Sequence, residues 1–201
     1  MLAGGKAKRL GGKEKPLLKV GSLALIDHIL KKLLPLFREI IVVTNTPHLY
    51  AGRPARVVQD EVLGQGPLRG ILSGLKASAS RENFVVAGDM PFINLNLVEF
   101  LKKEAPRFDV VIPEVSGKLE PLFAFYSKNC LPFIEEAIKK NFKVVSFLSL
   151  VNVKYIGEEK VKSLDPQNLS FFNINTPEDL VRAQKLYLDS RKARIEKISH
   201  R

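Results

Sequence analysis

Glycine and basic residues are concentrated in the segment LAGGKAKRLGGKEK, at residues 2–15. Consecutive glycines let a backbone approach a ligand closely and turn several N–H groups toward it, as in an anion-binding nest. Arg9, Lys13 and Lys15 would add charged donors to phosphate oxygens. The segment is not a P-loop, because Glu14 follows its last Gly-Lys pair where a Ser or Thr would hold magnesium. It predicts a phosphate-binding loop of another kind, with a flexible basic segment as the alternative.

Carboxylate and amide side chains recur where predicted strands end. Asp60 follows ARVV, and Asp89 ends the run NFVVAGD. Ligands of parallel sheets bind beyond the carboxyl ends of the strands, and Mg²⁺ at a phosphate site takes one or two carboxylates. For a single Asp the alternative is a helix cap or a turn. Asn173 and Asn175 alternate in FFNINT, which predicts one face of a short strand, or an Asx turn at Asn175.

Short apolar runs alternate with helical patterns along the whole chain, which predicts the elements that would position these residues. The predicted strands are 38–44, 55–58, 83–89, 108–113 and 121–127. The predicted helices are 22–34, 67–79, 94–104, 128–140 and 176 to about 188. The pattern indicates an α/β fold with a single doubly wound, mostly parallel sheet flanked by helices. We expect one domain over 1–201, with 189–201 as a charged helix end or tail.

Composition narrows the class of protein. With 201 residues, 45% hydrophobic and 26% charged, the chain is typical of a globular domain, and no apolar run approaches the ~20 residues of a membrane span. A cytoplasmic location without a membrane partner is therefore expected. The single cysteine, Cys130, excludes an internal disulfide and a Cys-based zinc cage. The net charge of +11 is spread over the chain without an RNA-binding or finger motif, so nucleic acid is not the expected partner.

Five segments together resemble one known family. They are LAGGKAKRLGGKEKPLL, GPLRGILSGL, VAGDMPF, LEPLFAFYS and FNINTPEDL, in this order from residue 2 to about 184. The sequence resembles the molybdenum cofactor guanylyltransferases, a family of the nucleotidyltransferase superfamily with a Rossmann-like fold. The resemblance implies transfer of GMP from GTP to molybdopterin with release of pyrophosphate. It also implies transient contact with molybdoenzyme apoproteins or their chaperones.

The resemblance also assigns roles to residues of this sequence. The implied nucleotide-binding residues are Leu2, Ala3, Gly4, Gly5, Lys15, Asn45, Asp60, Gly66, Pro67, Leu68 and Asp89. The implied catalytic residues are Arg9, Lys15 and Asp89. Asp89 matches the family's magnesium ligand, and we expect Asn175 to share the ion. Relatives that use CTP begin with LAAG and differ at the GPL segment, so Gly4-Gly5 and Gly66-Pro67-Leu68 favour guanine.

The implied reaction needs no general base, and the sequence has no His-based catalytic motif that would supply one. Molybdopterin ends in a phosphate monoester that is largely ionised near neutral pH, so it attacks without a general base. None of His28, His48 and His200 lies in a catalytic motif. The remaining task is to position two anions and neutralise their charge. Arg9, Lys15 and the glycine-loop N–H groups would stabilise the departing pyrophosphate.

The beginning of the sequence departs from the family pattern. Relatives carry an apolar strand of several residues before LAGG, and only Met1 and Leu2 stand there. We expect a shortened first strand in the structure and a true start upstream of Met1. Other readings stay open: a molybdopterin cytidylyltransferase, a sugar-phosphate nucleotidylyltransferase, or an inactive relative that carries the cofactor or docks on molybdoenzymes.

Overall fold

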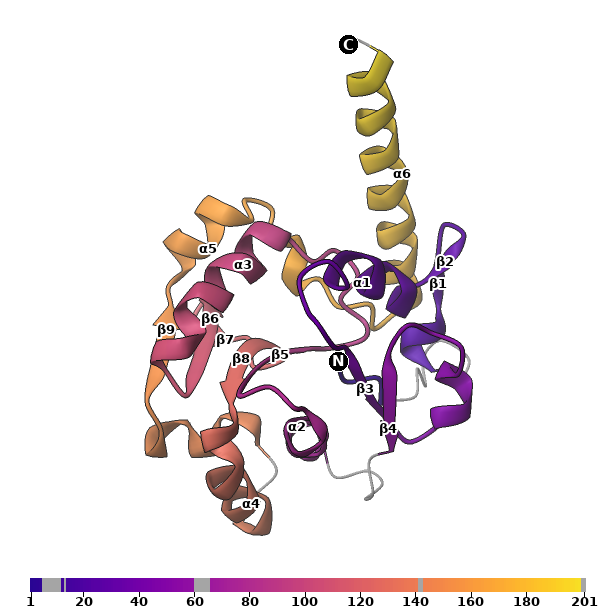
Figure 1. Ribbon diagram of the computed structural model, residues 1–201. Helices are drawn as coiled ribbons and strands as arrows, with labels where there is room; N and C mark the ends of the chain where they lie inside the picture. Colours follow the sequence, from indigo (N-terminus) through magenta and orange to yellow (C-terminus); the bar gives the residue numbers. More distant parts are fainter. Residues whose placement is uncertain (5–11, 13, 60–65, 141–142, 200–201) are drawn as a thin grey trace.

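A β-sheet with helices on both faces forms the body of the protein, which the computed structural model describes for residues 1–4, 12, 14–59, 66–140 and 143–199 (Figure 1). Its longer strands are β3 (Ile41–Thr44), β4 (Arg56–Gln59), β5 (Glu82–Val86), β6 (Val110–Val115), β8 (Phe123–Ser127) and β9 (Val153–Ile156). Short antiparallel pairs add β1 (Lys19–Val20) with β2 (Leu23–Ala24), and β7 (Lys118–Leu119) with β6.

The strand order places five of the longer strands in one direction. β3 pairs with β4 in parallel, and β9 runs parallel beside β6. β8 lies antiparallel between β5 and β6, so β5 and β6 share a direction. Leu2 bridges Val43 and Ala87 in parallel and so connects the β3–β4 pair with the rest. The resulting order, β4-β3-β5-β8-β6-β9, confirms the predicted mostly parallel sheet.

Helices cover both faces of this sheet. They are α1 (Leu25–Leu33), α2 (Pro67–Ala77), α3 (Leu95–Glu104), α4 (Leu131–Lys140), α5 (Glu158–Leu164) and α6 (Pro177–Ser199). Leu68, Ile71 and Leu75 of α2 form one apolar cluster with Ile134 and Ile138 of α4. A second cluster contains the buried faces of α1, α3 and α5. Helices on both faces confirm the doubly wound arrangement.

Alternation along the central strands divides the core into these two layers. In β6, Val110 and Ile112 belong to the layer of α2 and α4, whereas Val111 belongs to the layer of α1 and α3. In β8, Ala124 and Tyr126 alternate with Phe123 and Phe125 in the same way. Successive strand residues point to opposite faces, so near-continuous apolar runs are what a sheet buried on both sides requires.

The first three residues join the two parts of the sheet. The Leu2 amide donates to the carbonyl of Val86 (2.9 Å), and the Ala3 amide donates to that of Val43 (2.8 Å). Gly88 and Val43 in turn donate to the carbonyls of Leu2 (2.8 Å) and Met1 (3.0 Å). This short connection matches the expected shortened first strand.

A hollow continues between β3 and β5 beyond Met1. It is lined by residues of both strands, among them Ile41, Phe84 and Val85, and by Phe37. The Met1 amino nitrogen donates to the carbonyl of Ile41 at 2.8 Å. Burial lowers the pKa of this amine to about 5, because the charged form loses its hydration.

The last helix, α6, extends away from the body (Figure 1). Its first half packs on β1 through a third apolar cluster that contains Val20 and Ala183. The side chain of Gln184 accepts from the amide of Gly21 (2.8 Å) and donates to the carbonyl of Lys19 (3.1 Å). Gly21 has a φ of +63°, and a Cβ there would lie 2.4 Å from the Tyr187 ring. The first half of α6 is therefore fixed against β1 and the turn at Gly21. Among the described residues, no helix is long and apolar enough to cross a membrane.

Candidate active site

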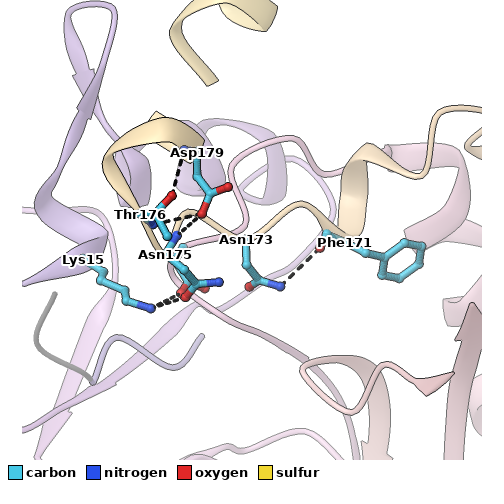
Figure 2. Close-up of polar contacts among 7 residues, drawn as sticks. Lys15, Phe171, Asn173, Asn175, Thr176 and Asp179 are labelled. Carbon is cyan, nitrogen blue, oxygen red and sulfur yellow. Dashed lines mark hydrogen bonds and ion pairs between the residues drawn. The ribbon is translucent and has the colours of Figure 1, made fainter. Parts of the chain in front are cut away.

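Three side chains from distant parts of the sequence meet at the carboxyl edge of the sheet (Figure 2). The Lys15 Nζ lies 3.2 Å from Asp89 Oδ2 and donates to Asn175 Oδ1 at 2.5 Å. Lys15 begins a short 3-10 helix, Lys15–Leu17, Asp89 follows β5, and Asn175 precedes α6. The side chains of Lys15 and Asp89 are 23% and 17% exposed, so the ion pair is partly shielded from water.

The backbone around Asp89 is fixed by close packing. Gly88 lies against the loop that begins the chain, and a Cβ there would lie 2.8 Å from Pro16 Cγ and 3.1 Å from the Leu2 carbonyl oxygen. Only glycine leaves room for this approach. The Asp89 carbonyl accepts from the amide of Ile174 (3.1 Å), which ties the strand end to the segment before α6.

The segment that carries Asn175 is held by the cap of α6 (Figure 2). The amides of Asn175 and Thr176 both donate to Asp179 Oδ2 at 2.9 Å. The Asp179 amide donates to Thr176 Oγ1 at 3.2 Å, which completes a reciprocal cap. These backbone donors, first that of Asn175, lower the pKa of the Asp179 carboxyl. The cap formed by Thr176 and Asp179 thus also orients the Asn175 backbone.

Asn173 lies in the same pocket but not on a strand. The prediction of a short strand over FFNINT is wrong, because Leu169–Phe171 forms a 3-10 helix and Asn173 follows it without strand pairing. Its Nδ2 donates to the Phe171 carbonyl (3.2 Å). A small pocket brings Asn173 together with Leu2, Gly4, Lys15, Pro16, Ala87, Gly88, Asp89 and Leu122.

The remaining predicted residues lie around this edge or outside the described residues. Asn45 follows β3, and its Oδ1 is buried without a hydrogen-bond partner among the described residues. Gly66 has a φ of +76° and precedes α2, with Pro67 at the first helical position. The side chain of Leu68 is fully buried in the core, so only its backbone is left to take part in the predicted nucleotide site. The residues outside the described ranges are Gly5, Arg9 and Asp60.

Sequence reasoning missed two side chains that hold the start of the glycine segment. The Tyr50 hydroxyl donates to the carbonyl oxygen of Ala3 at 3.0 Å, and Thr44 Oγ1 donates to the same oxygen at 3.3 Å. Tyr50 is fully buried, and burial raises its pKa, so the hydroxyl keeps its proton. No local motif predicts the contact between Tyr50 and Ala3, because the two residues are 47 positions apart in the sequence.

The metal-binding capacity of the pocket comes from oxygen atoms. Among the described residues, no three His, Cys, Asp or Glu side chains form a group that could hold a metal ion. Asp89 Oδ2 and Asn175 Oδ1 already converge on one cation, the Lys15 ammonium. One carboxylate and one amide oxygen suit a hard divalent ion that completes its shell with phosphate and water.

A mostly parallel sheet that carries Gly4, Lys15 and Asp89 at its carboxyl edge has the arrangement of a nucleotide-binding protein of the Rossmann-like class. The family model of the MobA-like NTP transferase domain matches residues 1–153. The chain belongs to this family of nucleotidyltransferases.

Two curated relatives and one solved structure are similar to this chain over most of its length. A probable molybdenum cofactor guanylyltransferase of Pelotomaculum thermopropionicum is 39% identical over 97% of this chain and 95% of its own. The molybdenum cofactor guanylyltransferase of Syntrophotalea carbinolica is 36% identical over 89% of this chain and 86% of its own. The crystal structure of molybdopterin-guanine dinucleotide biosynthesis protein A from Archaeoglobus fulgidus has a TM-score of 0.82 and 32% identity, and covers 94% of this chain and 97% of its own.

Proposed function

We propose that the protein transfers GMP from GTP to molybdopterin in a magnesium-dependent reaction that releases pyrophosphate. The observation that carries this proposal is the meeting of Lys15, Asp89 and Asn175 at the carboxyl edge of the sheet. The names of the relatives support these substrates, because proteins that match most of the chain are named molybdenum cofactor guanylyltransferases.

The nucleotide would bind along the same edge. Leu2 and Ala3 lie between β3 and the end of β5, Asn45 follows β3, and the first turn of α2 offers the backbone of Gly66–Leu68. The Oδ1 of Asn45 is buried and has no hydrogen-bond partner within the part of the chain that the structure describes, which supports a role as an acceptor for a nucleotide N–H or O–H. From the sequence we add Gly5, Arg9 and Asp60 to this site.

The proposed metal ligands are Asp89 and Asn175. A bound magnesium ion would supply charge neutralisation at the phosphate oxygens of GTP. These two residues suit a metal ion because the Asp89 carboxylate and the Asn175 amide each direct one oxygen to the same cation, the Lys15 ammonium.

The chain's own contribution to the reaction is positioning and positive charge. Lys15 lies where it can donate to phosphate oxygens, and Arg9 would add a second charged donor. No general base is needed, because the attacking group is an ionised phosphate. The net charge of +11 favours two anionic substrates. We further propose a cytoplasmic protein that delivers its product to molybdoenzyme apoproteins or their chaperones.

Calorimetric titration with GTP, CTP and ATP, with and without Mg²⁺, tests the proposed nucleotide site. We expect GTP-selective binding that Mg²⁺ strengthens, and loss of this strengthening in Asp89→Asn. Asp189→Asn, which changes an exposed carboxylate on α6, is the matched control and should behave as the wild type.

Each alternative has its own result in this titration. Preference for CTP would identify a cytidylyltransferase and contradict the assignment of the base. Absence of binding to all three nucleotides would contradict the enzyme assignment and favour a docking or carrier protein.

A further inference from the structure

One cation already bridges the two oxygens that the proposed function gives to the metal. The ammonium of Lys15 contacts Asp89 Oδ2 (3.2 Å) and Asn175 Oδ1 (2.5 Å). An ammonium group is a compact point charge with three donors on a flexible four-carbon stem. The same group that the proposed function assigns to the phosphates therefore interacts with the metal ligands instead.

The backbone of this cluster is fixed, so only the lysine side chain has to move. Pro16 is buried and lies against Gly88, which holds the Lys15 backbone beside the end of β5. The amide of Leu18 donates to the Lys15 carbonyl (3.0 Å) and closes the 3-10 turn. The Asp89 carbonyl accepts from Ile174, which keeps the Asn175 segment in place.

Lys15 and a divalent cation cannot share these oxygens. Both are positive and would lie within contact distance of one another in a pocket where the Lys15 and Asp89 side chains are 23% and 17% exposed. Repulsion between like charges is stronger in such a partly buried site than in water. Entry of the divalent cation therefore requires departure of the ammonium.

We propose that Lys15 and the divalent cation exchange at the Asp89–Asn175 pair, an inference that rests on the proposed function. In the nucleotide-free protein, Lys15 is the cation of this pair. When the metal arrives with the triphosphate, the ammonium leaves for the phosphate oxygens, which the nucleotide supplies at the same moment. Lys15 thus weakens binding of the bare metal and strengthens binding of the metal–nucleotide complex, which couples the two ligands.

The test measures binding of Mn²⁺ alone, by electron paramagnetic resonance of the free ion at constant ionic strength. We expect Lys15→Met to bind Mn²⁺ about tenfold more tightly than the wild type, in the range of ordinary coupling factors. The same variant should bind the Mn²⁺–GTP complex more weakly than the wild type. Lys15→Gln, with the same expectation, serves if the methionine variant fails to fold.

Two controls separate exchange from general electrostatics. Lys19→Met removes one positive charge from an exposed side chain nearby and should leave Mn²⁺ affinity within about twofold of the wild type. Lys15→Met combined with Asp89→Asn should show no gain over Asp89→Asn alone, because the carboxylate is the shared partner.

The outcomes distinguish this inference from the proposed function. Unchanged or weaker Mn²⁺ binding in the folded Lys15 variants would overturn the exchange, and so would an equal gain in Lys19→Met. If the wild type also fails to bind Mn²⁺–GTP, the proposed function fails with it. If the wild type binds Mn²⁺–GTP through Asp89, the proposed function stands without the exchange.

Discussion

At the scale of single residues, buried hydrogen bonds hold the backbone of Ala3 between β3 and β5. Its oxygen accepts from Tyr50 and Thr44, and its amide donates to Val43. Both polar groups of the Ala3 backbone are therefore satisfied inside the protein.

Tyr50→Phe tests this network. Loss of the hydroxyl removes one buried hydrogen bond and should lower the free energy of unfolding by about 1 kcal/mol, with weaker GTP binding. Urea unfolding and calorimetric titration measure the two effects. Tyr155→Phe is the matched control, because Tyr155 on β9 is 48% exposed, and it should change neither quantity. Equal GTP affinity in Tyr50→Phe and the wild type would contradict the positioning role.

At the scale of secondary-structure elements, residues 1–3 form the described connection between β3 and β5. Residues 1–3 link the two strands by backbone hydrogen bonds. Beyond Met1, the hollow separates the remaining residues of β3 from those of β5. The buried Met1 amine has a pKa of about 5, against 8.0 for the unperturbed group. Between these values the unfolded chain binds the proton and the folded chain does not.

A chain that begins at Met1 should therefore become more stable as the pH rises from 5 to 8. The slope from this amine is at most about 1.4 kcal/mol per pH unit. Nα-acetylation of Met1 should remove this slope, and a short Val/Ile-rich extension should do the same while filling the hollow. Urea unfolding at several pH values, taken as the difference between the acetylated and free chains, isolates the amine. A difference that does not vary with pH would contradict the burial of a neutral amine.

Local sequence patterns predicted most of these elements but not their pairing. The five predicted strands correspond to β3, β4, β5, β6 and β8, because each has a continuous apolar run. β9 was missed because Lys154 and Tyr155 are exposed and interrupt such a run. The antiparallel direction of β8 could not be predicted from local sequence either. It follows from the short connection through β7, which pairs with β6 before the chain enters β8.

At the scale of the whole molecule, the fold brings the two ends of the family signature together. Lys15 and Asn175 are 160 positions apart in sequence, and α6, which follows Asn175, packs on β1. The sequence pattern predicted Lys15, Asp89 and Asn175 as site residues. Their direct contact could not be predicted, because it requires the sheet order and the position of α6.

Truncation of α6 tests which part of this helix supports the site. The residues 188–192 are exposed, whereas Ala183 is fully buried. A chain that ends after Asp189 should keep its GTP affinity and change the free energy of unfolding by no more than about 0.5 kcal/mol. A chain that ends after Arg182 should lose several times more stability, because Ala183, Gln184 and Tyr187 are removed. Equal loss in both chains, measured by urea unfolding, would show that the part of α6 after Asp189 is structural.

The most direct test of the central claim is turnover with purified molybdopterin, GTP and Mg²⁺, followed by the formation of the guanine dinucleotide and of pyrophosphate. We predict one pyrophosphate per dinucleotide formed, a strong preference for GTP over CTP, and a rate about 10²–10³ lower in Asp89→Asn. Dinucleotide formation from CTP in preference to GTP, or formation from GTP that is unaffected in Asp89→Asn, would contradict the account.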